Sequence, residues 1–325
     1  MKHGYKGQGV TICSKENVLK YVFNDVFGLE YDTDKSDKYA KHATLVMDYI
    51  CQVAPDANKL AIETQGKIDG PYNNRVLHSA GMDYLQQNVP DIMTTSYFKS
   101  TDIKEPKKSL YKKLYDKGCF LVCASGNDDI EELEPLTQGD VWKAVGACRL
   151  VDGQVKIEKD YATGEEMDFV SFHNLRATWD NKKHLGTSFS APLFAGMLAL
   201  VQCFFKSKTG KKLNHEQLIN FIKDNCIDLG KEGHDTRTGY GLLVLPAPES
   251  IQIKKYNEDY KESEEEKMSK FNKIDEIPDW GKATIEKLIE KKVLKGDENN
   301  NLNISEDLLR TFVIHDRMGL YDLNK

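Results

Sequence analysis

Short apolar runs rich in β-branched residues alternate with longer stretches of helical periodicity over about the first 245 residues. The runs that predict strands, each bounded by Gly, Pro or polar clusters, are Val10–Cys13, Lys59–Glu63, Ile92–Ser96, Phe120–Ala124 and Val141–Cys148. The stretches between them that predict helices are Leu45–Val53, Asn74–Gln87 and Lys107–Lys117. Strands and helices that alternate in this order favour an α/β fold, in which helices cover both faces of a mostly parallel sheet. Ligand sites in such folds lie at the carboxyl ends of the strands.

The last part of the chain has a different pattern. Residues 254–270 are densely charged and poor in apolar residues, which predicts a solvated linker or an exposed helix. Two amphipathic sets follow, Ile277, Trp280, Ile285, Leu288, Ile289, Val293 and Leu294, and then Leu308, Leu309, Phe312 and Val313. They predict two short helices around a small core. We therefore expect a main domain over residues 1–250, a charged linker over 251–272 and a small helical C-terminal module over 273–325.

The composition argues against several classes of protein. Lys and Arg number 45 and Asp and Glu 51, a formal net charge of −6 with no large block of one sign, so no nucleic-acid partner is expected. The longest mostly apolar stretch, Ala195–Phe205, is about half of the ~20 residues that cross a bilayer, so no membrane span is predicted. No Gly-rich fingerprint follows the first predicted strand, which argues against a nucleotide-binding doubly wound domain.

The cysteines and the N-terminal residues bear on the compartment. Seven cysteines, an odd number, are scattered mostly inside apolar runs and predict no disulfide framework. Cys119 and Cys123 have no matching Cys/His pair elsewhere, so a zinc site is not predicted. The N-terminal sequence MKHGYKGQGVTIC lacks the apolar segment of a secretory signal. We therefore expect a reducing, cytoplasmic location.

The segment GTSFSAPLFAGMLALV, residues 186–201, carries the strongest chemical signal. It predicts a helix that is apolar on nearly all sides and therefore buried, with Ser188 at its N-terminus. Free backbone N–H groups and the positive end of the helix dipole suit a developing oxyanion there. Pro192 fits the first helical turn, where its missing N–H has no intrahelical partner. A Ser at the start of a helix is by itself usually only a cap, so a catalytic role for Ser188 depends on the residues around it.

Three motifs together resemble the subtilisin-like serine proteases (subtilases, peptidase S8 family). GTSFSAP is similar to the nucleophile motif GTSxAxP of that family, and Ser188 takes the nucleophile position. KHATLVMDYICQVAPDA resembles the HGTxVA segment, which implies that His42 is the general base. CASGNDD resembles the AAGN segment, which implies that the side chain of Asn127 donates to the oxyanion. The His motif precedes the Asn motif, which precedes the Ser motif; this order agrees with the Asp, His, Ser order of subtilisins and differs from the Ser, Asp, His order of α/β-hydrolases.

The resemblance covers about residues 5–245 and implies a subtilisin-like three-layer fold. DIMTTSYF looks like the substrate-binding strand of the family, and VWKAVGAC and MDFVSFHN look like its later strands. The residues that this alignment places in the substrate site are Ser96, Tyr97, Phe98, Ser125 and Gly126. Phe98 stands where the family usually has Gly, so the first specificity pocket is expected to be narrow and to prefer a small side chain.

The acid of the triad is the least regular part of the resemblance. The first motif of the family ends in Asp, and GQGVTICSKENV places Glu16 at that position. A Glu can orient a His, but its extra methylene requires the backbone to retreat by ~1 Å or more. Other carboxylates that precede His42 are Asp25, Asp32, Asp34 and Asp37. Three readings stay open: Glu16 is the acid, one of these Asp residues is, or the chain has no functional acid.

The resemblance implies a serine endopeptidase that acts on peptide or protein substrates. The alternative is a catalytically impaired pseudoprotease of the same fold that binds a peptide or a partner protein. No cofactor is predicted; calcium is considered because family members often bind it, but DTDKSD and DDIEELE lack a specific arrangement of ligands. The C-terminal segment resembles a single S-layer-homology-type repeat of lysins of Firmicutes and their phages, which implies cell-wall contact or association and a bacterial or prophage origin.

Overall fold

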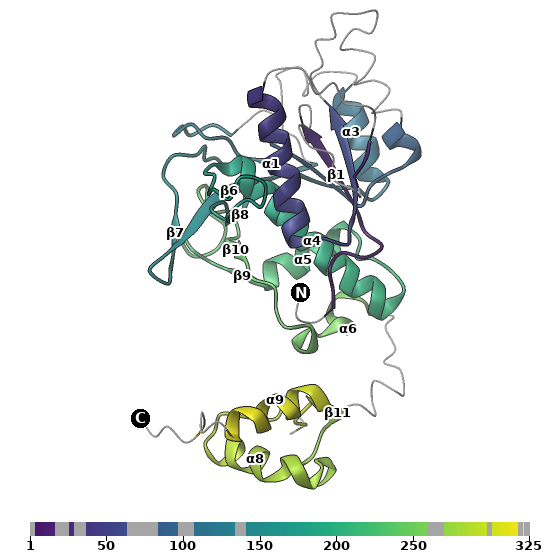
Figure 1. Cartoon of the computed structure of the whole chain (residues 1–325), viewed down its shortest axis with the longest axis vertical. Helices are drawn as coiled ribbons and strands as arrows, with labels where there is room; N and C mark the ends of the chain where they lie inside the picture. Colours follow the sequence, from purple (N-terminus) through teal and green to yellow (C-terminus); the bar gives the residue numbers. More distant parts are fainter. Residues whose placement is uncertain are drawn as a thin grey trace, which may run out of the picture. The chain divides into compact units, whose positions relative to one another are not determined.

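The computed structural model describes residues 4–16, 26–28, 37–63, 84–96, 107–133, 141–258, 270–297, 301–317 and 321. The chain divides into two compact units, residues 1–257 and 258–325. Each unit has its own hydrophobic core. Figure 1 shows the helices and strands of both units along the chain.

Strands of the first unit form one sheet, as the alternating sequence pattern predicts. In the described residues its ten strands run in the order β2-β3-β1-β4-β5-β6-β8-β10-β9, with β7 paired to β6. The bounds are β1 Thr11–Glu16, β2 Val26–Gly28, β3 Asn58–Glu63, β4 Ile92–Thr95, β5 Phe120–Ala124, β6 Trp142–Val151, β7 Gln154–Ile157, β8 Met167–Phe172, β9 Cys226–Ile227 and β10 Leu242–Leu243. Only the pairs β6–β7 and β9–β10 are antiparallel among them. The mostly parallel sheet is therefore confirmed.

The bounds of the helices of the first unit are α1 Asp37–Val53, α3 Lys107–Asp116, α4 Thr187–Thr209, α5 His215–Asp224 and α6 Ile253–Tyr256, with a 3₁₀ turn at Pro248–Ser250. Helices α1 and α4 are longer than the sequence pattern predicts, whereas α3 agrees with the predicted helix Lys107–Lys117 to within one residue. Most of the predicted helix Asn74–Gln87 lies outside the described residues. Its described part, residues 84–87, is helical. Helix α4 extends beyond Val201 because its apolar positions continue through Phe205.

Alternate residues of the central strands face two different cores, which makes the unit a three-layer structure. Ile12, Ile92 and Val122 pack with α1, α4 and α5 on one face. Their neighbours Cys13 and Met93 pack with α3 on the other face. Side chains of successive strand residues point to opposite faces of a sheet, so strands covered on both sides must be apolar throughout. The predicted three-layer α/β architecture is confirmed.

Helix α4 is the central helix of this unit. It meets the length and composition of a membrane-spanning helix, but 89% of its apolar window is buried inside the structure. It packs against α1 and against strands β1, β4, β5, β6 and β8. A helix surrounded by protein in this way must be apolar on all sides, which explains the sequence of residues 186–205.

All seven cysteines are free, as predicted. Burial raises the pKa of the Cys148 and Cys226 thiols to about 12. Protonated thiols of this kind act as small apolar side chains rather than as nucleophiles.

The first unit ends at Asn257, past the expected domain end at residue 250. The reason is Tyr256, whose ring packs against Phe205 and Phe221 with centroid distances of 5.9 and 5.1 Å. Its hydroxyl donates a hydrogen bond of 2.8 Å to Asp224. Tyr256, together with Ile251 and Ile253, thus packs the start of the charged segment against the main core.

The second unit contains the two expected helices, α8 (Asp279–Glu290) and α9 (Glu306–Arg317), with a short pair of strands, β11 (Lys270–Phe271) and β12 (Ile304–Ser305). Ile285, Leu288 and Leu309 are fully buried between them. Trp280 and Val293 were expected in this core but are 42% and 64% exposed. Helix α8 turns Gly281 inward against Leu309, which leaves its neighbour Trp280 outside, beneath the guanidinium of Arg310.

Candidate active site

The side chains that the sequence singles out lie at the carboxyl ends of parallel strands, beside the N-terminus of α4. Glu16 is the last residue of β1, Ser96 follows β4, and Asn127 lies three residues past the end of β5. Neighbouring parallel strands end at the same edge of a sheet, so residues distant in sequence meet there. The candidate site therefore lies at this edge of the sheet.

Glu16 and His42 form a pair. Oε2 of Glu16 lies 3.3 Å from Nδ1 of His42, which projects from α1 with 28% of its side chain exposed. The other carboxylate oxygen of Glu16, Oε1, accepts a hydrogen bond from the backbone N–H of Ser96. Glu16 is buried. Its carboxylate can therefore orient the imidazole and stabilise an imidazolium, with Nε2 left for proton transfer.

The four alternative Asp carboxylates that precede His42 lie outside the part of the chain whose side chains the structure describes, so their role as the acid stays untested. Asp25, Asp32 and Asp34 lie outside the described residues. Asp37 is the first residue of α1, and its side chain is outside the described part.

Ser188 is the second residue of α4 and 8% exposed. Its backbone oxygen accepts a hydrogen bond of 2.6 Å from Oγ of Ser96. The ring of the next residue, Phe189, lies 5.7 Å from the imidazole of His42. The turn that carries Ser188 is thus in contact with the Ser96 side chain, and the residue beside it touches His42.

Asn127 is hydrogen-bonded to the first turn of α4, which carries Ser188. Its Oδ1 accepts hydrogen bonds from the backbone N–H and the hydroxyl of Thr187, at 2.8 and 3.1 Å. Asn127 is exposed, and no described residue accepts from its Nδ2. Because Oδ1 is held by Thr187, the amide is fixed with its N–H groups directed away from that residue. Such a fixed donor suits stabilisation of an oxyanion.

The residues predicted to line the substrate site are only partly described. Ser125 is fully buried, and its Oγ has no hydrogen-bond partner among the described residues. The backbone N–H of Gly126 donates to the hydroxyl oxygen of Thr187 at 3.3 Å, and the backbone oxygen of Gly126 lies 3.1 Å from the same hydroxyl as an acceptor. Tyr97 and Phe98 lie outside the described residues, so the narrow specificity pocket stays a prediction.

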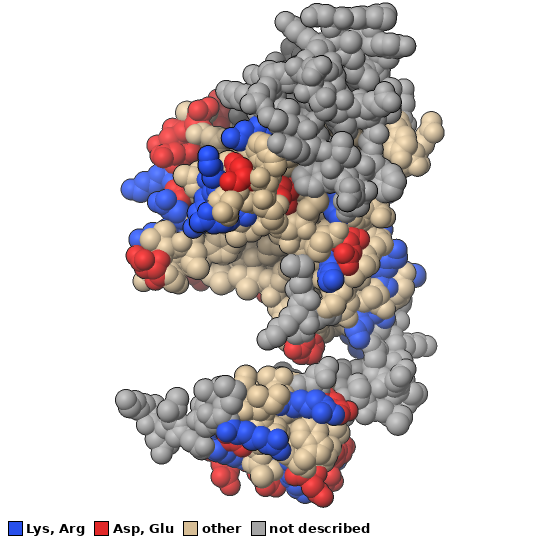
Figure 2. All heavy atoms as spheres, in the orientation of Figure 1, with Lys and Arg blue, Asp and Glu red and all other residues tan. Residues whose placement is uncertain are grey.

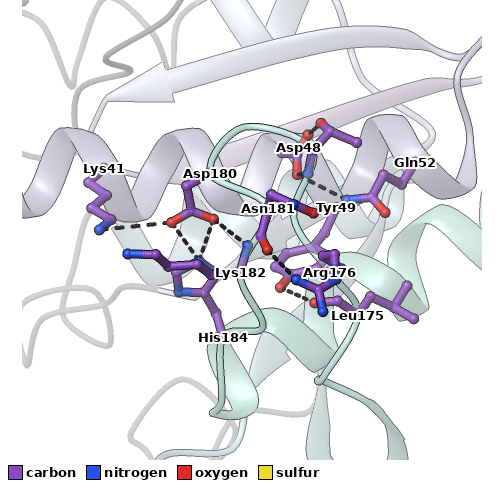
Figure 3. Close-up of polar contacts among 11 residues, drawn as sticks. Lys41, Asp48, Tyr49, Gln52, Leu175, Arg176, Asp180, Asn181, Lys182 and His184 are labelled. Carbon is purple, nitrogen blue, oxygen red and sulfur yellow. Dashed lines mark hydrogen bonds and ion pairs between the residues drawn. The ribbon is translucent and has the colours of Figure 1, made fainter.

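The loop that leads into α4 is tied to α1 by polar contacts from three positions (Figure 3). The Tyr49 hydroxyl donates to the backbone oxygen of Leu175 at 2.8 Å. The buried Asp48 accepts from the backbone N–H of Thr178 at 2.8 Å. Lys41, adjacent to His42, lies 4.0 Å from the carboxylate of Asp180. The helix that carries His42 and the loop that precedes Ser188 are therefore held in one arrangement.

Sequence reasoning gave no role to His173, which also contacts this loop. Its Nδ1 accepts a hydrogen bond of 2.8 Å from the backbone N–H of Gly186, two residues before Ser188. The signal was present in MDFVSFHN, where a His ends an apolar strand, but its partner could not be found from spacing.

Other features lie apart from this edge. No group of three or more His, Cys, Asp or Glu residues able to hold a metal occurs in the described part of the chain. An apolar cavity of about 390 Å³ lies along the later turns of α4, lined by residues that include Leu200, Phe204 and Phe221. On the face in Figure 2, charged side chains of both signs border a largely uncharged central area.

The subtilase (peptidase S8) family profile matches residues 21–241. The chain belongs to the subtilase family. This subtilase is 28% identical over 213 residues to the major intracellular serine protease of Bacillus subtilis (strain 168), which covers 63% of this chain and 65% of that protein. It is also 28% identical over 212 residues to the minor extracellular protease Epr of the same organism, covering 64% of this chain and 31% of the relative. The chain thus spans less than two thirds of each relative.

A solved structure supports the fold. The crystal structure of a lanthipeptide protease superposes with a TM-score of 0.58 and 17% identity, covering 74% of this chain and 88% of that one. The C-terminal unit, residues 258–325, lies outside the subtilase match.

Proposed function

We propose that this subtilase is a serine endopeptidase in which Ser188 is the nucleophile, His42 the general base and Glu16 the acid. The observation that carries the proposal is the position of Ser96. Its backbone N–H donates to Glu16, which pairs with His42, and its hydroxyl donates to the backbone oxygen of Ser188. One residue thus links the acid to the nucleophile turn.

The proposed reaction transfers an acyl group. Oγ of Ser188 attacks the carbonyl carbon of a peptide bond while Nε2 of His42 takes the hydroxyl proton. The resulting tetrahedral intermediate collapses when His42 delivers that proton to the leaving amine, which breaks the C–N bond and leaves an ester on Ser188. A water molecule, deprotonated by His42, then attacks the ester. The acid product leaves, and Ser188 regains its proton.

Asn127 and the backbone N–H of Ser188 are proposed to stabilise the oxyanion. The support for Asn127 is that Thr187 fixes its Oδ1, so its Nδ2 donor needs no reorganisation when charge develops. The backbone N–H of Ser188 lies in the first turn of α4, where no intrahelical acceptor exists and the helix dipole favours negative charge.

A fluorophosphonate probe tests the assignment directly. Wild type is expected to be labelled on Ser188 and to hydrolyse an unstructured protein such as casein, whereas Ser188→Ala should do neither. Folded wild type that is neither labelled nor active would instead support a non-catalytic subtilase fold that binds a peptide or a partner protein. Peptides that differ only at the residue before the scissile bond, Ala against Phe, test the predicted preference for a small side chain.

The role of the C-terminal unit is proposed from sequence resemblance alone. An S-layer-homology-type repeat implies cell-wall contact or association of copies. Co-sedimentation of the full chain with Gram-positive cell walls, compared with a chain ending at Asn257, tests the first role, and sedimentation velocity of the same two chains tests the second. Equal behaviour of both chains in both assays would remove this proposal. The cytoplasmic location stays a prediction.

A further inference from the structure

His173 occupies an unusual place for a histidine. It follows β8 directly and is buried beneath the turn that enters α4. Nδ1 accepts the backbone N–H of Gly186 at 2.8 Å, and Nε2 lies 3.1 Å from Oε1 of Glu158. Glu158 in turn pairs with Arg149 at 2.8 Å.

These contacts specify one protonation state of the imidazole. A backbone N–H can only donate, so Nδ1 must present a lone pair to Gly186. The carboxylate of Glu158 can only accept, so the single ring proton must sit on Nε2. The groups facing His173 from the packed elements are Glu158 after β7 and Arg149 on β6. The guanidinium of Arg237 donates to the backbone oxygens of residues 158 and 159 and lies over the Tyr161 ring.

The position of Gly186 makes this contact important for Ser188. Gly186 has φ 122° and ψ 155°, a conformation open essentially only to glycine. Its peptide N–H is fixed by His173, and the next N–H, that of Thr187, is fixed by Asn127. Two successive peptide planes are therefore set by side chains immediately before the nucleophile turn.

We propose that His173 is a positioning residue whose neutral imidazole holds the peptide plane before Gly186 and thereby fixes Ser188 for attack. The inference rests on the proposed function of Ser188. It assigns His173 no contact with substrate. A misplacement of about 1 Å at a reacting group lowers the rate about 10²-fold, so loss of this anchor should reduce kcat and leave KM nearly unchanged.

A matched pair of variants tests the proposal in the full chain. His173→Asn places an amide oxygen where Nδ1 of the imidazole lies. His173→Leu gives a side chain branched at the same carbon but without a hydrogen-bond acceptor. At about pH 8 we expect His173→Asn to keep kcat within about 5-fold of wild type and His173→Leu to lower it about 10- to 100-fold, with KM within about 3-fold in both. His234→Asn, which removes a histidine bonded to the backbone oxygen of Met167, is the control and should leave kcat unchanged.

The outcomes separate this proposal from the assignment of Ser188. An active wild type with equal kcat in His173→Asn and His173→Leu overturns the positioning role alone, while an inactive, unlabelled wild type overturns the proposed function. If His173→Leu does not fold, Glu158→Gln decides. An amide can donate to Nε2 as well as accept from it, which releases the tautomer, so kcat should fall about 3- to 10-fold. An unchanged kcat in that variant overturns the proposal.

Discussion

Oε2 of Glu16 lies 3.3 Å from Nδ1 of His42, although the matching motif of the subtilisin-like proteases has Asp at this position. The longer side chain of Glu reaches the imidazole from the end of β1. The carboxylate is also held by the backbone N–H of Ser96. Shortening the side chain therefore removes both contacts at once.

The first prediction concerns the length of this acid. Glu16→Asp retracts the carboxylate by about one C–C bond and should lower kcat/KM about 10- to 100-fold rather than raise it. Glu16→Gln keeps the length but loses the charge and should lower kcat about 10³- to 10⁴-fold. Steady-state kinetics on a peptide substrate measures both. Wild-type activity in Glu16→Gln would move the role to another carboxylate.

A second prediction separates the two functions of the Asn127 amide. Asn127→Asp keeps the acceptor that binds Thr187 but loses the donor, so kcat should fall about 10²- to 10³-fold with little change in KM. The melting temperature should stay close to that of wild type. A large fall in melting temperature with kcat preserved in the folded fraction would show that the residue is only structural.

A third prediction concerns Gly186. A Cβ at this position would lie 3.0 Å from Oδ1 of Asn127, in a backbone conformation that disfavours any side chain. Gly186→Ala should lower the free energy of unfolding by about 1–3 kcal/mol and also reduce kcat. Gly153→Ala is the control, since Gly153 also has positive φ but open space around it. It should cost about 1 kcal/mol or more in stability and leave kcat unchanged.

The pH dependence of stability gives a fourth prediction. Burial lowers the pKa of His173, with contacts to Glu158 opposing part of the effect. An unfolded chain binds a proton at this residue near pH ~6.5, whereas the folded chain does not until a lower pH. Stability therefore falls as the pH drops below ~6.5. His173→Asn lacks this loss, so the unfolding free energy of wild type minus that of the variant should decrease on acidification. A pH-independent difference in urea titrations would contradict this.

The fifth prediction concerns the boundary between the units. Each unit has its own core, and Tyr256 closes the first one. A chain ending at Asn257 should therefore fold and keep the kcat of the full chain within about 3-fold, whereas a chain ending at Ser250 loses the Tyr256 ring. Loss of a buried aromatic costs about 3–5 kcal/mol. Equal melting temperatures for the two truncated chains would be evidence against that packing.

The fold was predictable because strand and helix periodicity, together with the apolar helix at Thr187–Thr209, depend on local sequence. The pairing of Glu16 with His42 was predictable only from the order of the family motifs. Glu16 ends a strand and His42 lies on a helix, and local periodicity does not say that the fold brings these two positions together. His173 was not, because its contact with Gly186 depends on the path of a loop. The prediction that Trp280 belongs to the C-terminal core was wrong, because amphipathic spacing does not reveal that Gly281 takes the inner position.

Ser96 is hydrogen-bonded both to Glu16, which precedes it by 80 residues, and to Ser188, which follows it by 92 residues. Contacts between such distant segments form late, since the entropy of closing long loops opposes them until much of the sheet exists. The proposed hydrolytic centre is therefore expected to assemble only at the end of folding. A half-folded copy would lack the geometry proposed for catalysis.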